Sequence, residues 1–282
     1  MGKLTIAITG ANSGIGLRAA RMMAADGHRV LALCRDPRRG AEAVATIERG
    51  ELVAVDLADP ASVDAAAAAV AARVERLDVL INNAAVFDQT VREAVITPAG
   101  HELFWATNHL GPFQLTALLS PLLAASPHPR VVNVASKGLL TMPRIRIRFD
   151  ELDRPDWYTP TRAYYHAKLA QIMFTFTLAE RGGGRLDATC VRVPSVRLDP
   201  GRVRALPPLL RALYAPKNRL AMPAERLGET YARLARGEGP AGGYLDENLH
   251  RVEAPAHARD PAARERLWDL SQQAVGDPCW AW

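Results

Sequence analysis

The stretch that decides the fold is Thr9-Gly10-Ala11-Asn12-Ser13-Gly14-Ile15-Gly16. It follows an apolar segment at residues 4–9, which we expect to be a strand, and it opens a helical pattern that runs to Asp26. Glycines let the backbone turn tightly and approach a pyrophosphate, and the amides at a helix N-terminus bind phosphates. The order of strand, glycine-rich turn and helix therefore predicts a dinucleotide site rather than a plain turn.

Short apolar runs alternate with helical patterns as far as residue 192. We expect strands at residues 4–9, 30–34, 52–55, 79–81, 131–134 and 186–192, with helices at residues 14–26, 38–48, 60–76, 101–125 and 163–181 between them. Three more helices follow, at residues 206–213, 224–236 and 261–275. This alternation predicts an α/β protein with a Rossmann-type, doubly wound parallel sheet and helices on both faces. No linker interrupts it, so residues 1–282 are expected to form a single domain.

Charge argues against nucleic-acid binding. The 282 residues carry a net charge of +5, from 35 basic and 30 acidic side chains, and the excess is scattered along the chain. Arg144, Arg146 and Arg148 alternate with isoleucines, which favours one face of a strand over a basic stripe.

Cysteine usage points to a reducing compartment. Cys34, Cys190 and Cys279 form no C-x-x-C pair and have no metal-ligand spacing, so we expect neither a disulfide framework nor a metal site. No apolar run is long enough to span a bilayer, and no signal peptide is evident. The sequence therefore predicts a cytoplasmic protein without a transmembrane segment.

The end of the second strand indicates which dinucleotide binds. The residue beside the adenosine ribose is expected about 20 residues after the glycine-rich turn. That region reads Leu33-Cys34-Arg35-Asp36. Cys34 cannot hold two ribose hydroxyls as a carboxylate would, whereas Arg35 offers a charged planar fork to a 2′-phosphate. We therefore expect NADP(H), with Asp36 as an opposing charge and Arg38 and Arg39 either contributing or simply solvated.

Tyr164 and Lys168 are four residues apart, so they share one face of the helix expected at residues 163–181. A free tyrosine has a pKa of about 10 and is a poor base at neutral pH. A neighbouring ammonium group favours the phenolate, so we expect Lys168 to lower the pKa of Tyr164. Tyr164 would then donate a proton to a carbonyl, or accept one from an alcohol.

Together these motifs resemble the short-chain dehydrogenase/reductase superfamily, and more narrowly its retinol-dehydrogenase-like branch. The resemblance runs from Thr9 to about Val275. Its supporting stretches are residues 9–16, 54–57, 81–85, 107–111, 131–136, 149–152 and 164–168.

The resemblance implies roles for individual residues. The catalytic set would be Asn108, Ser136, Tyr164 and Lys168, with Asn108 kinking its helix and holding a water, Ser136 binding the substrate oxygen and Lys168 binding the nicotinamide ribose. The cofactor-binding set would be Gly10, Asn12, Ser13, Gly14, Ile15, Gly16, Arg35, Asp56, Leu57, Asn82, Ala84, Tyr164, Lys168, Pro194 and Val196. Structural roles remain open for three of them, since Asp56 could cap the helix at residue 60, Asn108 could be an ordinary helix residue and Ser136 could cap a turn.

The sequence departs from the family after the sixth strand. Relatives have a Pro-Gly turn there, followed by a hydroxyl residue that contacts the cofactor. This chain has Pro194-Ser195-Val196-Arg197-Leu198-Asp199, so the expected hydroxyl is missing. Asp199 facing a pyrophosphate would be repulsive unless it points away or Arg197 or Arg202 compensates.

These features predict an NADP(H)-dependent oxidoreductase, a ketoreductase or alcohol dehydrogenase that acts on an apolar or aromatic carbonyl or alcohol. Residues 195–240 are expected to form a substrate lid, because residues 206–214 are rich in apolar side chains. The alternatives are an NADP(H)-binding sensor or scaffold with little turnover, and an epimerising or two-step reductase. The resemblance also allows a homodimer or homotetramer that pairs through the helices carrying Asn108 and Tyr164.

Overall fold

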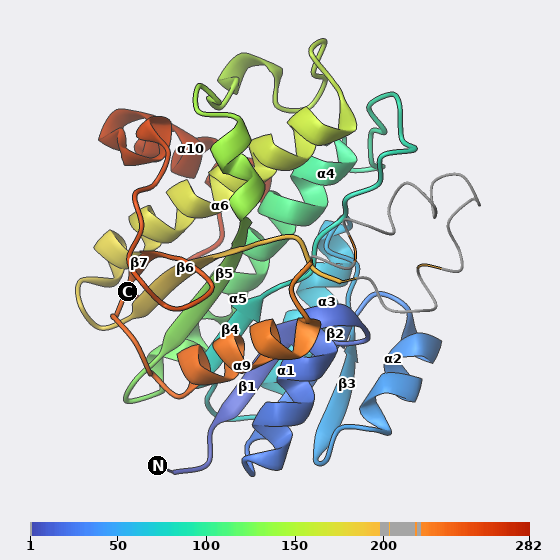
Figure 1. Cartoon of the computed structure of the whole chain (residues 1–282). Coiled ribbons are helices and arrows are strands. Elements are labelled where there is room, and N and C mark those ends of the chain that lie inside the picture. The colour runs from blue at the N-terminus through green and yellow to red at the C-terminus, as the bar shows by residue number, and fades with distance from the viewer. Residues whose placement is uncertain (1, 198–202, 204–217, 219–220) are drawn as a thin grey trace.

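A seven-stranded parallel sheet runs through the centre of the computed structural model, which describes residues 2–197, 203, 218 and 221–282 (Figure 1). Its strands are β1 (Thr5–Thr9), β2 (Arg29–Cys34), β3 (Gly50–Ala54), β4 (Val79–Asn82), β5 (Arg130–Ser136), β6 (Asp187–Val193) and β7 (Gly243–Leu245). Their order is β3-β2-β1-β4-β5-β6-β7. The chain moves outward from β1 to β3 and then returns to β4 on the other side, so the order reverses between β1 and β4. The doubly wound α/β fold expected from the sequence is confirmed.

Both faces of the sheet are buried, which explains why the strands read as continuous apolar runs. Ile6 and Ile8 of β1 pack into one core cluster. Ala7, between them, points to the opposite cluster with Leu31 and Leu33 of β2. Alternate side chains therefore serve two separate cores.

Helices cover these two faces. Their bounds are α1 (Gly14–Ala25), α2 (Pro37–Val44), α3 (Pro60–Ala71), α4 (Leu103–Trp105), α5 (Gly111–Ala124), α6 (Pro160–Gly182), α9 (Ala224–Ala235) and α10 (Pro261–Ala274). Helices α1 and α9 pack on the face carrying Ile6 and Ile8, through residues such as Met23 and Tyr231. Helices α3, α5 and α6 cover the other face.

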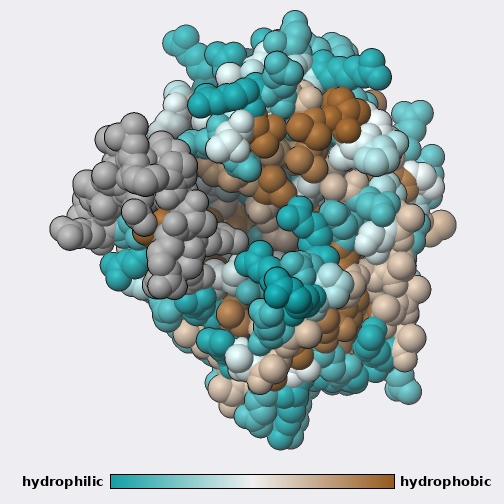
Figure 2. Space-filling view, turned by 90° about the vertical axis from the view of Figure 1, so that its right-hand side faces the viewer, coloured by the Kyte–Doolittle hydropathy of each residue, from teal (hydrophilic) through white to brown (hydrophobic). Residues whose placement is uncertain are grey.

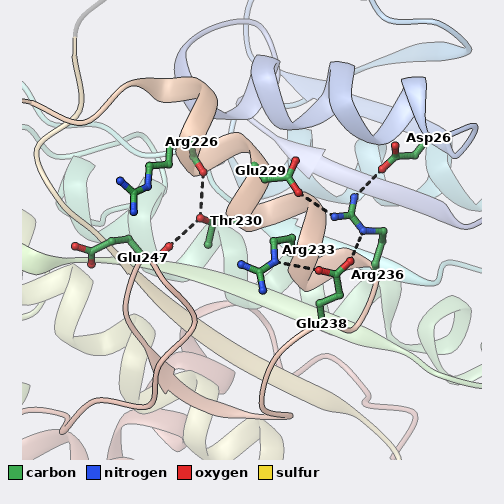
Figure 3. Close-up of polar contacts among 8 residues, drawn as sticks. All are labelled: Asp26, Arg226, Glu229, Thr230, Arg233, Arg236, Glu238 and Glu247. Carbon is green, nitrogen blue, oxygen red and sulfur yellow. Dashed lines mark hydrogen bonds and ion pairs between the residues drawn. The ribbon is translucent and has the colours of Figure 1, made fainter.

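An ion-pair network ties α9 to the end of α1, as Figure 3 shows. The Arg236 guanidinium lies 2.7 Å from Asp26, 2.9 Å from Glu229 and 2.7 Å from Glu238. Helix α9 falls within the range expected to form a lid, but it packs against α1 and buries Leu227 and Tyr231 completely. Helix α9 is therefore a layer helix, and the lid at residues 195–240 stays a prediction. The helix expected at residues 206–213 lies outside the described residues.

Three further expectations need correction. The helix expected at residues 101–125 is α4 and α5 separated by a π-helix at Ala106–Leu110, because this turn is wound with one extra residue around Asn108. No strand forms among residues 142–148, where Arg144, Arg146 and Arg148 lie in turns and irregular chain. Strand β7 was not expected, since it has only three residues and opens with Gly243.

The outer surfaces of α5 and α6 are covered by α10 and by the segment that follows it. The Trp268 ring of α10 lies 5.0 Å from Phe113 of α5, and Trp280 lies 4.7 Å from Trp268 and 5.2 Å from Phe113, as measured between ring centroids. In α5, only Pro121 and Ala124 are exposed. Among the described residues, no helix is long and apolar enough to cross a membrane.

Candidate active site

A groove opens at the carboxyl ends of the strands, where β1 and β4 meet and the strand order reverses. This is the position at which open parallel sheets bind ligands. The groove has a volume of about 360 Å³ and is lined by Thr9, Gly10, Asn12, Ser13, Gly14, Ile15, Leu33, Arg35, Asp36, Arg39, Val55, Asp56, Leu57, Asn83, Ala84, Ala85, Val86, Thr107, Val196 and Arg197. Most residues expected to bind the cofactor are therefore brought together, although Gly16, Asn82, Pro194, Tyr164 and Lys168 are not among those lining the groove.

The glycine-rich turn has the geometry that its sequence requires. Gly10 has a φ angle of +69°, which L side chains rarely adopt. A Cβ atom on Gly16 would lie 2.5 Å from the Gly10 carbonyl oxygen and 2.6 Å from Asn83 Nδ2, so only glycine fits there. Helix α1 begins at Gly14 and directs its first amides toward the groove, where they can bind phosphate.

The loops after β1 and β4 are hydrogen bonded to each other. Thr9 Oγ1 accepts from the amides of Asn83 and Ala84 at 3.0 Å and 2.9 Å, and Asn83 Nδ2 donates to the Thr9 carbonyl oxygen at 2.8 Å. Asn82 is buried instead and donates to Thr116 Oγ1 and Asn133 Oδ1, so it supports the turn from below. Thr9 and Asn83 were not expected as site residues, although the pattern Asn-Asn-Ala after a strand could have indicated the second.

The arginine-rich end of the groove lies beside α2. Arg35 and Arg39 line it, whereas Arg38 is 82% exposed and lies 3.7 Å from Glu42. Asp36 caps α2, because its Oδ1 accepts from the amides of Arg38 and Arg39 at 3.0 Å and 3.1 Å. The helix N-terminus thus offsets the carboxylate expected to oppose a phosphate.

Asp56 and Leu57 line the same end of the groove. Asp56 Oδ1 accepts from the amide of Ala58 at 3.0 Å, whereas the residue that caps α3 is Asp59. The structural alternative of Asp56 as a helix cap is therefore wrong.

Thr107 is a groove residue that the sequence analysis did not select. It is 7% exposed, and its hydroxyl is a buried oxygen without a hydrogen-bond partner among the described residues. Buried hydroxyls are nearly always paired, so an unpaired one that faces a groove fits a polar group of a ligand. Its position was hidden in the sequence because Thr107 precedes Asn108 within what reads as an unbroken helix.

Asn108 lies in the π-helix and fastens two segments together. Its Oδ1 accepts from the Val86 amide at 2.7 Å and its Nδ2 donates to the Val86 oxygen at 2.9 Å. Its main-chain oxygen accepts from Gln171 Nε2 of α6 at 2.8 Å. The alternative of an ordinary helix residue is therefore wrong: Asn108 joins the loop after β4 to the helix that carries Tyr164.

Ser136 and Tyr164 meet at the end of β5. The Ser136 side chain lies near enough to Tyr164 for hydrogen bonding to lower the tyrosine pKa, and Ser136 Oγ accepts from the Gly138 amide at 3.2 Å. The serine thus caps the turn after β5 and also contacts the tyrosine. Lys137, the next residue, lies 2.7 Å from Glu247 beside β7, which anchors this turn to the sheet edge.

Lys168 is buried, and its Nζ donates to the Val134 oxygen of β5 at 2.7 Å. The same Nζ lies 5.7 Å from the centroid of the Tyr164 ring. Burial lowers the pKa of Lys168 to about 8. Ser136, Tyr164 and Lys168 are therefore brought together, and Asn108 is linked to them through α6.

The tyrosine does not have the expected pKa. Burial, reinforced by Tyr165, raises the pKa of Tyr164 to about 12, and the hydrogen bond with Ser136 only partly offsets this. The expectation of a lowered Tyr164 pKa is therefore wrong, because the effect of burial outweighs that of the neighbouring groups. The spacing showed that the two side chains share a helix face, but it could not show how strongly each is desolvated.

Comparison with known proteins places this site in a family. The family model described as short chain dehydrogenase matches residues 4–145. The chain belongs to the short-chain dehydrogenases. It is 39% identical to the human dehydrogenase/reductase SDR family member 13, over 96% of this chain and 73% of that protein. It is 35% identical to human retinol dehydrogenase 12, over 98% of this chain and 87% of that protein, which supports the retinol-dehydrogenase-like branch.

Solved structures of other proteins have the same fold. The crystal structure of an uncharacterized protein from Mycobacterium paratuberculosis matches with a TM-score of 0.72 and 30% identity, over 97% of this chain and 94% of that one. A short chain dehydrogenase/reductase family protein matches with a TM-score of 0.64 and 26% identity, over 90% and 97% of the two chains.

The loop after β6 departs from the family pattern within the described residues as well. Val196 forms a parallel bridge with Met222, and Val196 and Arg197 both line the groove. Leu198, Asp199 and Arg202 lie outside the described residues. The loop therefore contributes an apolar and a cationic side chain to the groove, but no hydroxyl as far as residue 197.

Proposed function

We propose that this short-chain dehydrogenase is an NADP(H)-dependent oxidoreductase acting on an apolar or aromatic carbonyl or alcohol, with Tyr164 as the acid/base. The observation that carries the proposal is the meeting of Ser136, Tyr164 and Lys168 at the end of β5. This is the end of the sheet at which the groove opens, where the carboxyl ends of the strands lie. A sensor or scaffold would not require a reactive hydroxyl, a hydrogen-bonded serine and a buried lysine together. Turnover is therefore favoured over binding alone.

The groove fits a nicotinamide dinucleotide with a 2′-phosphate. Gly16 allows the backbone to approach the cofactor closely, and the N-terminus of α1 can bind the pyrophosphate. The buried Thr107 hydroxyl, which has no hydrogen-bond partner among the described residues, can bind a polar group of the cofactor. Arg35 and Arg39 supply two cations at the end where a ribose phosphate would lie, while Asp36 is engaged by α2. We propose NADP(H) on the strength of these charges.

The chain's own residues divide the chemistry between them. The bound cofactor supplies or accepts the hydride. Tyr164, which its pKa of about 12 keeps protonated at neutral pH, donates the proton to the carbonyl oxygen during reduction. Ser136 donates a hydrogen bond to that oxygen and steadies it. Lys168 provides a fixed positive charge beneath the tyrosine that stabilises the phenolate as it forms.

An apolar substrate agrees with the exposed side chains of the described residues. The large exposed apolar residues include Phe87, which is 45% exposed, and Leu140 in the turn after Ser136, which is 60% exposed. On one face of the molecule, apolar residues gather around a hollow in the upper half of Figure 2. The relatives named for retinol, an apolar alcohol, also favour this class. We propose reduction as the direction, since NADPH is the cofactor.

The test is NADPH oxidation by the purified protein in the presence of a panel of apolar aldehydes and ketones. Consumption that requires the carbonyl and disappears in Tyr164→Phe is the expected result. NADPH binding without consumption of any carbonyl, in the wild type, would favour the sensor.

A further inference from the structure

Phe87 lies against the catalytic tyrosine. Their ring centroids are 4.4 Å apart and the rings are tilted by 32°. Despite this contact Phe87 is 45% exposed, so one part of its ring packs on Tyr164 and another part remains accessible. An aromatic ring held beside a reacting hydroxyl and open on one side is available to a substrate.

The position of Phe87 is fixed by its neighbour. The main-chain amide and oxygen of Val86 are both bonded to the Asn108 side chain, at 2.7 Å and 2.9 Å. These two bonds hold the backbone one residue before Phe87. Asn108 in turn is tied to α6 through Gln171, so the phenylalanine and the tyrosine are held by the same framework.

A second aromatic ring also contacts Tyr164. The rings of Tyr164 and Tyr165 are 5.3 Å apart at 63°, in an edge-to-face arrangement. Tyr165 packs its hydroxyl end closely against Gly138 in the turn after Ser136, so that a Cβ atom there would clash. The Tyr164 ring thus contacts two other aromatic rings, those of Phe87 and Tyr165.

We propose that Phe87 contacts the substrate and determines specificity, selecting carbonyl compounds with an aromatic ring over saturated ones of the same size. This inference rests on the proposed function only in taking Tyr164 as the reacting group. A flat ring bound beside the carbonyl stacks on Phe87, or meets its edge, while the carbonyl oxygen reaches Tyr164. A saturated ring buries similar apolar area but gains no aromatic pair. Phe87 therefore contributes preference rather than catalysis.

The experiment compares benzaldehyde with cyclohexanecarbaldehyde, which are nearly equal in size. With NADPH saturating, kcat/KM is measured for both aldehydes in the wild type, Phe87→Leu and Phe87→Tyr. The matched control is Val95→Ala, since Val95 is 46% exposed on the same loop and has no aromatic ring. Phe87→Leu is expected to reduce the ratio of benzaldehyde to cyclohexanecarbaldehyde about three- to tenfold. Phe87→Tyr and Val95→Ala are expected to leave it unchanged.

A binding measurement separates this inference from the proposed function. Tyr164→Phe keeps the ring but lacks the proton donor, so the aldehydes can be titrated against its NADPH complex by ligand-detected NMR. Adding Phe87→Leu to this variant is expected to weaken benzaldehyde binding and to spare cyclohexanecarbaldehyde. That result supports the inference even if the wild type turns neither aldehyde over, in which case only the proposed function fails. An unchanged ratio in both measurements, or no binding of either aldehyde, would overturn the inference.

Discussion

Lys168 donates a hydrogen bond of 2.7 Å to the main-chain oxygen of Val134, two residues before the serine that contacts Tyr164. The catalytic helix is thereby fastened to strand β5 at the point where the reacting groups meet. Because the lysine is buried, its pKa falls to about 8, while that of Tyr164 rises to about 12. Tyrosine and lysine normally have similar pKa values. Here the two values are far apart, and the lysine loses its proton first.

This order predicts the pH dependence of reduction. Tyr164 is protonated throughout the accessible range and sets no limit, whereas the Lys168 cation is present below its pKa and lost above it. We expect kcat/KM for a carbonyl to be level near neutrality and to fall as the pH rises through about 8. Lys168→Arg should move this decline to higher pH, because a guanidinium keeps its charge. A profile that stays level to about pH 10 would show that the lysine charge is not required.

Cofactor choice depends on Arg35. Its replacement by alanine should weaken NADPH binding by about 10- to 100-fold, the loss expected for charge-assisted hydrogen bonds to a phosphate. NADH, which lacks the 2′-phosphate, should be almost unaffected. Arg38→Ala is the matched control, since Arg38 lies outside the groove lining beside Glu42. Dissociation constants for both cofactors give the answer, and equal losses for NADPH and NADH in Arg35→Ala would contradict it.

Thr107 provides a second probe of the groove. Thr107→Val keeps the shape of the side chain and removes the unpartnered hydroxyl, so NADPH should bind about three- to tenfold more weakly. Thr177 is a suitable control, because its hydroxyl is also buried without a partner among the described residues but lies on α6, away from the groove lining. Both variants are measured by NADPH fluorescence titration. Equal affinities in the two variants would remove Thr107 from the site.

The covered faces of α5 and α6 have a consequence for assembly and stability. Pairing through those faces would require Trp268 and Trp280 to leave Phe113, so we expect no dimer that uses them.

Trp280→Ala should lower the free energy of unfolding by about 1–2 kcal/mol, as this half-buried ring loses part of its apolar contact. Leu140→Ala, at an exposed site, should not change it. Chemical denaturation measures the effect of Trp280→Ala on stability. A dimer found by light scattering, with contacts that include the outer face of α5, would contradict the expectation on assembly.

Local sequence was enough to predict much of the fold and part of the site. Glycines at positions 10 and 16 are required by backbone geometry, and those requirements are visible in the letters themselves. The spacing of Tyr164 and Lys168 fixes their shared face because a helix has a constant period. Arg35 was located by counting along a β-α-β unit, and it lines the groove as that count indicated.

The remainder depends on contacts between distant segments. The π-helix lies where the resemblance implied a kink at Asn108, but the helical spacing alone does not show it, and the bond between Asn108 and Val86, 22 residues earlier, forms only in the folded chain. The open hydroxyl of Thr107 and the ring of Phe87 beside Tyr164 arise only once loops and helices meet. The pKa of Tyr164 was misjudged for the same reason, since burial is a property of the folded molecule.

The central claim is that Tyr164 protonates a carbonyl while the bound cofactor delivers hydride, and isotope transfer tests it most directly. The protein is incubated with benzaldehyde and NADPH deuterated at the transferable position of the nicotinamide, and the product alcohol is examined by mass spectrometry. The expected result is one deuterium in the alcohol, formed by the wild type and abolished in Tyr164→Phe. Tight NADPH binding with no deuterium in the product from this or any other apolar carbonyl would contradict the account.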